Sequence, residues 1–139
     1  MSYTIEKYTA SVMEVIGFFG QIDDVSPVKP GEVTEHCYVA FTDTGDPIGM
    51  LISDGSGYVP RVAVKENYRR KGIAKKLFTK MAEDLSFETA ELESRDDQTA
   101  ANEFYQQEGW TKVSTRKATD DDGSNFELYE WEIPREKLV

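Results

Sequence analysis

Apolar residues recur with a helical period in three stretches of the chain. After Ser11 they stand at positions 12, 15, 16 and 19, which is the spacing of one helix face, and Ser11 with Glu14 has the form of a capping box. A helix is predicted over residues 71–85 from the apolar stripe of Ile73, Leu77, Phe78, Met81 and Leu85. A third helix is predicted over residues 99–108, where Gly109 ends it.

Runs of apolar and β-branched residues between these helices predict strands. The predicted strands cover residues 37–42, 48–53, 58–64, 89–94, 110–116 and 126–133. Short turns rich in Asp and Gly separate the first three, which predicts an antiparallel meander. Pro60 lies within the third run, and because proline has no N–H to donate, the pairing is predicted to break there. Residues 20–31 predict a surface loop.

This order of elements predicts an α+β fold, with one mostly antiparallel sheet and helices on its faces. The 139 residues suit one ordinary domain, and an apolar content of 39% is enough for a core. No repeat, linker or change of composition divides the chain. Residues 1–139 are therefore predicted to form a single domain.

The charge balance narrows the classes of partner. With 26 acidic against 16 basic residues the formal net charge is −10, so most of the surface repels polyanions, and neither nucleic acid nor a membrane is expected as a partner. Residues 61–80 differ, because eight basic residues and one acidic residue give this window a charge of +7, against −17 for the rest of the chain. The sequence therefore predicts one local anion site in an acidic protein.

The single cysteine and the single histidine limit the chemistry further. Cys37 alone cannot form an intramolecular disulfide or a cysteine metal cluster, and His36 alone excludes a multi-histidine site, so no metal is expected. Both are interpreted as ordinary strand residues. The first residues lack a basic segment followed by an apolar run, and no stretch approaches the ~18 apolar residues of a membrane span. A soluble cytoplasmic protein is expected.

The most distinctive segment is the junction between the third strand and the second helix. The apolar strand end Val62-Ala63-Val64 is followed by a basic turn and by a helix that begins near Gly72. Free N–H groups at a helix start bind phosphate oxygens, glycine permits close approach, and Arg and Lys side chains pair with further oxygens. Neither a P-loop nor a G-x-G-x-x-G motif is present. A pyrophosphate suits this junction, and a solvated basic helix start is the alternative.

Two motifs resemble those of the GNAT (Gcn5-related) N-acetyltransferases. Residues 69–74, Arg-Arg-Lys-Gly-Ile-Ala, resemble the family signature [QR]-x-x-G-x-[GA], and an apolar strand precedes them. Residues 98–110 resemble the pattern N-x-x-A-x-x-F-Y-x-x-x-G-F, with Gln98 in place of Asn and Trp110 in place of Phe. The order of predicted elements along the whole chain is also similar to that of the GNAT fold.

The resemblance implies that acetyl-CoA binds where two central parallel strands, here 58–64 and 89–94, splay apart. It also implies that the pantetheine amides pair with the first of these strands and that the pyrophosphate lies at the helix start. The implied cofactor-binding residues are Val62, Ala63, Val64, Arg69, Arg70, Lys71, Gly72, Ile73, Ala74, Lys75 and Gln98. Gln98 is one methylene longer than the usual Asn, and this difference can displace the polar contact that the residue makes with the pantetheine arm.

The resemblance further implies direct transfer of the acetyl group to a primary amine in a ternary complex. Tyr105 would be the general acid that protonates the departing thiolate, with a core role as the alternative. Adjacent helix residues point about 100° apart, so Tyr105 and Phe104 are not expected to share one core face. The predicted strand 58–64 carries no acid, and the general base stays open among a water chain, Asp54, Glu93 and Asp96.

The acceptor is expected to be a small-molecule amine or a protein amino group. A cationic acceptor is favoured by the acidic residues around the loop 20–31, which are Asp23, Asp24, Glu32 and Glu35. Because dimers are common in the family, a homodimer is a further expectation. The alternative function is a non-catalytic acyl-CoA-binding or regulatory module. An acidic interaction protein without a cofactor is disfavoured by the clustered positive charge.

Overall fold

The computed structural model describes residues 2–9, 11–23 and 28–139. Its helices are α1 (Val12–Ile22), α2 (Ile73–Asp84) and α3 (Thr99–Gln107), and none in these ranges is long and apolar enough to cross a membrane. Its strands are β1 (Tyr3–Lys7), β2 (His36–Thr42), β3 (Pro47–Ser53), β4 (Arg61–Val64), β5 (Thr89–Arg95), β6 (Thr111–Thr119) and β7 (Asn125–Pro134). Short 3-10 turns are η1 (Pro30–Glu32), η2 (Glu66–Tyr68) and η3 (Arg135–Lys137).

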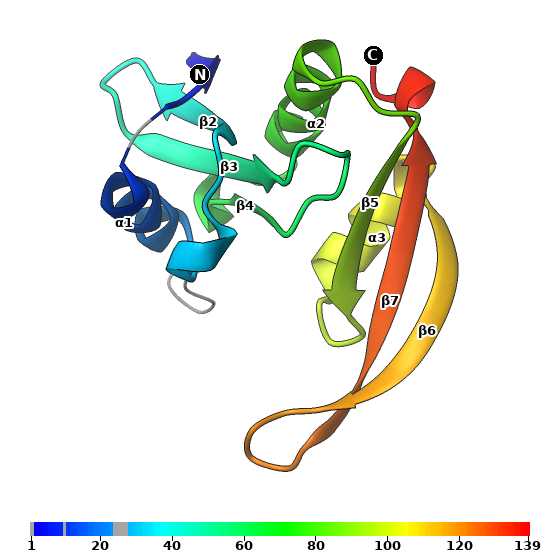
Figure 1. Ribbon diagram of the computed structural model, residues 1–139. Coiled ribbons are helices and arrows are strands. Elements are labelled where there is room, and N and C mark those ends of the chain that lie inside the picture. Colours follow the sequence, from blue (N-terminus) through cyan, green and yellow to red (C-terminus); the bar gives the residue numbers. More distant parts are fainter. Residues whose placement is uncertain (1, 10, 24–27) are drawn as a thin grey trace.

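The strands form two antiparallel sheets, and together with the helices they confirm the predicted α+β class (Figure 1). One sheet has the order β1-β2-β3-β4, and the other has the order β5-β7-β6. A parallel bridge between Tyr58 and Glu91 joins the two sheets. The single continuous sheet that was expected is therefore divided between β4 and β5.

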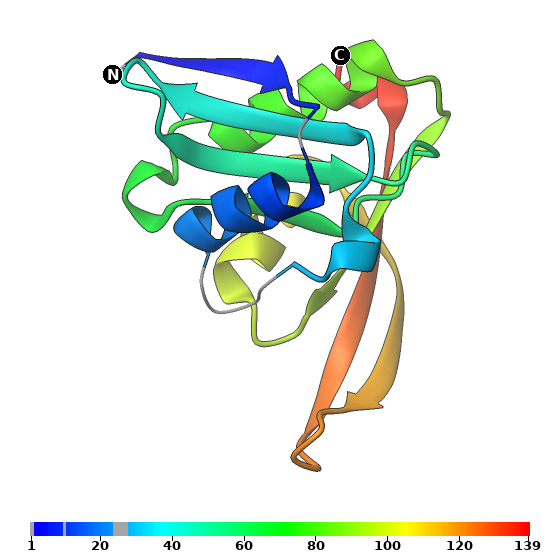
Figure 2. The same cartoon turned by 60° about the vertical axis from the view of Figure 1, so that its left-hand side comes forward.

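The first sheet is covered on both faces. On one face Phe19 of α1 belongs to a core cluster with Cys37 and Val39, and on the other face Leu77 of α2 belongs to a cluster with Tyr38. Figure 2 shows α1 lying across this sheet. Alternate residues of β2 thus enter two different cores, which explains why this strand is continuously apolar in sequence.

The helix ends follow local chemistry. The Ser11 side-chain oxygen accepts the Glu14 N–H at 3.2 Å, which confirms the predicted N-cap of α1. α1 continues to Ile22, so the loop predicted from residue 20 begins too early, because Ile22 is buried as part of the apolar face. α2 begins at Ile73, two residues later than predicted, because its N-cap Gly72 has a left-handed φ of +79°.

Three strand predictions also change. β1 has no counterpart among the predicted elements, although it pairs along β2 with Tyr3 opposite Thr42. The run 58–64 is not one strand, because β4 covers only its last four residues after a bend at Pro60, where the break was predicted. The final hairpin is longer than predicted at its outer end, since β6 continues to residue 119 and β7 starts at residue 125.

Candidate functional site

β4 and β5 lie side by side at one point and then diverge. The Val59 N–H donates to the Glu91 carbonyl at 2.9 Å, and the Glu91 N–H donates to the Gly57 carbonyl at 2.9 Å. After this bridge the two strands belong to different sheets. We call this divergence, from the Tyr58–Glu91 bridge to the ends of β4 and β5, the β4–β5 fork.

A β-bulge at Pro60 produces the fork. One residue of β3, Ser53, lies opposite Val59 and Pro60, because the flanking pairs are Asp54 with Tyr58 and Ile52 with Arg61. The extra residue reverses which peptide groups point toward β3. The groups that would continue the pairing with β5 are therefore turned to β3 instead.

The register shows which β4 peptide groups face the fork. The Lys65 N–H donates to the Ile48 carbonyl at 2.8 Å, so Lys65 and Ala63 lie at the hydrogen-bonded positions opposite β3. Val62 and Val64 lie at the alternate positions and direct their N–H and C=O groups into the fork. One of these groups is occupied, because Arg69 Nε donates to the Val64 carbonyl at 3.0 Å.

On the facing edge of β5, side chains of the following segment occupy the peptide groups of Arg95. Glu91 turns its peptide groups to β4, so the same alternation directs those of Glu93 and Arg95 into the fork. The Arg95 N–H donates to Gln98 Oε1 at 2.7 Å, and its carbonyl accepts from Asn102 Nδ2 at 2.9 Å. Gln98 was expected at the pantetheine arm, but its side-chain carbonyl oxygen accepts a hydrogen bond from β5.

The start of α2 lies one short loop beyond the β4 edge. The first backbone bond of this helix runs from the Lys76 N–H to the Gly72 carbonyl at 3.1 Å, so the amides of residues 73–75 have no partner within the helix. A Cβ built on Gly72 would meet no atom within 4 Å. Arg70 also has a positive φ, 64°. This glycine therefore leaves open space in front of three free amides.

The predicted phosphate-site side chains divide into two groups. Ile73 is buried in the core, so it can offer only its amide, and Ala74 is half-buried. The exposed members are Arg69, Arg70, Lys71 and Lys75. Lys75 lies 3.9 Å from a Glu108 carboxylate oxygen with its side chain 64% exposed, which leaves it available to an anion.

Tyr105 presents a buried ring on α3. Its ring centroid lies 5.7 Å from that of Phe104, 5.5 Å from Trp110 and 5.7 Å from Trp131. Burial raises the pKa of Tyr105 above its ordinary value, so the phenol stays protonated at neutral pH. The hydroxyl makes no hydrogen bond to the described residues, and 6% of the residue is exposed to solvent. Tyr105 is both a core aromatic and a phenol free to donate a proton.

A buried polar chain beside Tyr105 was not predicted. Trp131 Nε1 donates to Ser94 Oγ at 2.9 Å, and Ser94 Oγ donates to Asn102 Oδ1. Asn102 then reaches the Arg95 carbonyl in the fork. A polar residue at an inward position of β5 was the available signal, because Ser94 follows Ala90 and Leu92 on the buried face.

The three candidate bases have different surroundings. Asp54 accepts the Ser56 N–H at 2.8 Å within a turn, and Asp96 accepts the Glu127 N–H at 3.2 Å. Glu93 lies on β5 in the fork, on the strand face opposite the one that packs with Tyr105. Its carboxylate accepts from the Tyr58 hydroxyl at 3.5 Å and from an Arg116 guanidinium nitrogen at 2.9 Å.

Glu93 belongs to an acidic sheet face formed by β5 and β7. In the antiparallel register Glu91 lies opposite Glu132 and Glu93 opposite Glu130, so all four side chains project from the same face. Burial and the neighbouring Glu132 raise the pKa of Glu91. The alternation of acidic and apolar residues along both strands carried this signal in the sequence.

The acidic residues predicted near the acceptor are only partly available. Glu32 receives two hydrogen bonds from Arg61, at 2.8 and 3.0 Å, and this pairing lowers the pKa of Glu32. Asp23 is the C-cap of α1, and Glu35 is exposed on the chain before β2. Asp24 lies outside the described residues. The acidic sheet face places four glutamates on β5 and on the adjacent β7.

Cys37 and His36 lie on β2, as predicted for strand residues. Burial raises the pKa of the Cys37 thiol to about 12. The Nδ1 atom of His36 is buried without a partner. Within residues 2–9, 11–23 and 28–139, no group of three or more His, Cys, Asp or Glu side chains could hold a metal ion.

Solved acetyltransferases share this fold. The chain is similar to the ribosomal-protein-S18-alanine N-acetyltransferase from Escherichia coli, at 17% identity over 96% of this chain and 94% of that chain, with a TM-score of 0.74. It is similar to Ard1 from Thermoplasma volcanium, at 20% identity over 96% and 98%, with a TM-score of 0.74. It is also similar to Arabidopsis thaliana NAA60 in complex with a bisubstrate analogue, at 14% identity over 96% and 98%, with a TM-score of 0.73.

The chain therefore shares the fold of these solved structures, and its sequence identifies the family. Residues 34–112 match the family model described as an acetyltransferase (GNAT) domain. This match covers more than half of the chain, and the chain belongs to the GNAT acetyltransferases. No curated protein sequence matches it as a relative.

Proposed function

We propose that this chain is an acetyl-CoA-dependent N-acetyltransferase that transfers the acetyl group directly to a primary amine. The observation that carries the proposal is the juxtaposition of two sets of free backbone groups. One set is the β4 edge, with both peptide groups of Val62 and the N–H of Val64, and the other is the start of α2 at residues 73–75. An extended chain with amides followed by a pyrophosphate would satisfy both sets at once.

The α2 start would bind the phosphates of the cosubstrate. The amides of residues 73–75 and the positive end of the helix dipole attract a pyrophosphate, and Gly72 leaves room for it. Arg70, Lys71 and Lys75 are exposed around this point and can pair with further oxygens. Ala63 turns its peptide groups to β3, so it would contribute to the site only by holding β4 in place.

The chemistry would take place across the fork. The amine nitrogen attacks the acetyl carbonyl carbon, the carbon–sulfur bond breaks, and the thiolate takes a proton from the Tyr105 hydroxyl. A free Val62 or Val64 N–H would stabilise the developing oxyanion. Glu93, on the opposite strand face from Tyr105, would remove one proton from the acceptor ammonium group, directly or through water, before the neutral amine attacks. The second proton, lost from the nitrogen of the tetrahedral intermediate, would pass through water and restore the Tyr105 hydroxyl.

The acceptor would be a cationic small-molecule amine or protein amino group. Four glutamates of the acidic sheet face surround the Glu93 side of the fork and attract positive charge. Among the similar structures, one is an N-acetyltransferase of ribosomal protein S18 alanine. We further propose that residues 1–139 act as one catalytic domain in the cytoplasm and that a homodimer forms, which sedimentation can measure.

A second candidate is a non-catalytic acyl-CoA-binding module. The observation that favours it is the 2.9 Å bond between Arg116 and Glu93, because a carboxylate oxygen that already accepts a guanidinium hydrogen bond is less available to an acceptor amine. This candidate shares the cosubstrate site and differs only in turnover.

Thiol release from acetyl-CoA tests the proposed function. The acceptors are spermidine, free amino acids, an aminoglycoside and peptides with a free N-terminus, and acetylated product is identified by mass spectrometry. We expect release that depends on one class of amine. Coenzyme A binding without amine-dependent release in any class would support the non-catalytic module, and absence of coenzyme A binding would contradict both candidates.

A further inference from the structure

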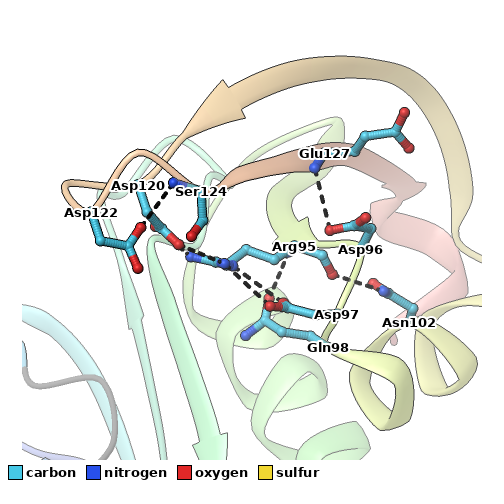
Figure 3. A network of polar contacts seen from close by, with 9 residues as sticks. All are labelled: Arg95, Asp96, Asp97, Gln98, Asn102, Asp120, Asp122, Ser124 and Glu127. Atoms are coloured by element: carbon cyan, nitrogen blue, oxygen red, sulfur yellow. Dashed lines mark hydrogen bonds and ion pairs between the residues drawn. The ribbon is translucent and has the colours of Figure 1, made fainter.

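Arg95 at the end of β5 holds three segments together (Figure 3). Its guanidinium donates to both Asp120 carboxylate oxygens, at 2.8 and 3.0 Å, and to both Asp97 oxygens at 3.2 Å. Its Cζ atom lies 3.9 Å from the centroid of the Phe126 ring. Asp97 belongs to the loop before α3, whereas Asp120 and Phe126 belong to the β6–β7 hairpin. We call these four residues the Arg95 clasp.

The clasp lies where regular pairing between β5 and β7 ends. The last pair in that register is Arg95 with Leu128. Beyond it the Asp96 N–H donates to the Glu127 carbonyl at 2.9 Å, and the hairpin then projects past the end of β5 (Figures 1 and 2). The clasp therefore attaches the outer hairpin to the body of the protein through side chains, beside the bond from the Glu127 N–H to Asp96.

Arg95 supplies the positive charge of this attachment. Residues 95–98 and 119–127 contain one basic residue, Arg95, and six acidic residues. Without the guanidinium, Asp97 and Asp120 would face each other as like charges. The bidentate bond to Asp120 also has a planar geometry that lysine cannot reproduce.

The hairpin held by the clasp reaches the acceptor side of the fork. Arg95 lies at the same strand face as Glu91 and Glu93, since these residues alternate along β5. Arg116 of β6 extends to Glu93 on that face at 2.9 Å. A hairpin released at its outer end would carry Arg116 away from Glu93, while Tyr105 and the α2 start lie on other elements.

We propose that Arg95 is a positioning residue for the acceptor: by clasping Asp120 of the hairpin to Asp97 of the loop before α3, it fixes the hairpin as a wall of the acceptor side of the fork. The inference rests on the proposed function. Arg95 touches neither the acetyl group nor the amine in this account, and it acts through the position of β6.

Two variants and a matched control test this role. Arg95→Gln and Asp120→Asn break the clasp, whereas Asp121→Asn makes the same charge change as the second variant on a neighbouring exposed carboxylate. We expect the first two to accelerate amide hydrogen exchange over residues 116–127 by about tenfold and to raise the KM for the acceptor by about tenfold. The acceptor probes are spermidine and a hexapeptide with a free N-terminal alanine. Coenzyme A affinity should stay within about twofold.

Different outcomes test the role of Arg95 and the proposed function. Unchanged hairpin exchange in Arg95→Gln, or an unchanged acceptor KM in a variant that has only lost thermal stability, would overturn the role of Arg95. If Asp120→Glu, which keeps the carboxylate, has the same acceptor KM as the unaltered chain, the result would support the role of Arg95. If the unaltered chain binds coenzyme A but acetylates neither probe nor any amine of the wider panel, the proposed function fails, and the acceptor role of Arg95 fails with it.

Discussion

Gly72 combines a backbone requirement with an electrostatic one. Its φ of +79° is costly for other residues, and the space in front of it is empty in the structure. We predict that Gly72→Asp lowers the affinity for coenzyme A by more than about 100-fold, because it places a carboxylate beside the proposed pyrophosphate position. Titration calorimetry measures this affinity.

Gly72→Ala is the matched control for this change. It introduces left-handed strain of about 1–2 kcal/mol without a charge, and this strain is no smaller than that of Asp, which enters the left-handed region more readily than Ala. Its loss of affinity should be much smaller than that of Gly72→Asp. Equal losses in the two variants would show that backbone strain, and not charge, controls binding at this glycine.

The Tyr105 hydroxyl is predicted to act in catalysis and to contribute little to folding. It has no hydrogen-bond partner among the described residues, so Tyr105→Phe should leave the free energy of unfolding and the coenzyme A affinity nearly unchanged. The value of kcat should fall by about 100-fold or more, because a general acid is lost. Steady-state kinetics with an acceptor from the panel checks this.

Tyr3→Phe is the control for this phenol, since the Tyr3 hydroxyl is also without a partner but lies on β1. It should turn over at the unaltered rate. If Tyr105→Phe were as fast as Tyr3→Phe, the general-acid role would be wrong.

At the residue scale, local chemistry made some site residues predictable and others not. Gly72 and Tyr105 stand in short motifs whose meaning does not depend on distant partners. The role of Asn102 could not be predicted from the sequence, because it requires Ser94 of β5 and Trp131 of β7. These two residues are brought together only by the register of the second sheet. The role of Arg95 could not be predicted for the same reason, since its partner Asp120 is 25 positions away.

At the scale of elements, the buried chain through Asn102 fixes α3 to the second sheet. Asn102→Ala would leave Ser94 Oγ without its acceptor and would remove one of the two donors to the Arg95 carbonyl, the other being the Gln98 N–H. We predict a loss of about 1–3 kcal/mol in the free energy of unfolding, the usual cost of unsatisfied buried polar groups. Denaturant unfolding measures it, with the exposed Gln106→Ala on the same helix as control. A loss no larger than that of the control would contradict the role of this chain.

The elements themselves were predicted where periodicity was strong and local. The α2 stripe and the meander of β2, β3 and β4 followed from such patterns, and Pro60 correctly marked the break before β4. β1 was not predicted, because its five residues contain only two apolar positions, Tyr3 and Ile5. The bulge could be expected from Pro60, but the direction of the freed peptide groups required the pairing of Lys65 with Ile48.

At the scale of the whole molecule, charge is divided between a basic junction and an acidic remainder. The window 61–80 carries +7 and the rest −17, so the binding of a phosphate ligand depends on short-range attraction within a repelling surface. We predict that raising the ionic strength from about 0.05 M to about 0.5 M weakens coenzyme A binding by roughly tenfold, because it screens exposed Arg and Lys residues.

Pantetheine, which has no phosphate, is the control ligand for this salt dependence. Its affinity should change little over the same range of ionic strength. An equal salt effect on both ligands would contradict the proposed role of the basic junction.

The proposed function requires the β4–β5 fork and the start of α2 to form one acetyl-CoA site. A crystal structure of the chain with acetyl-CoA shows whether they do. We expect pantetheine amides bonded to Val62 and to the Val64 N–H, the pyrophosphate on the amides of residues 73–75, and the thioester sulfur near the Tyr105 hydroxyl. Acetyl-CoA bound away from β4, or β4 paired continuously with β5 when it is bound, would show that the two elements do not form one site.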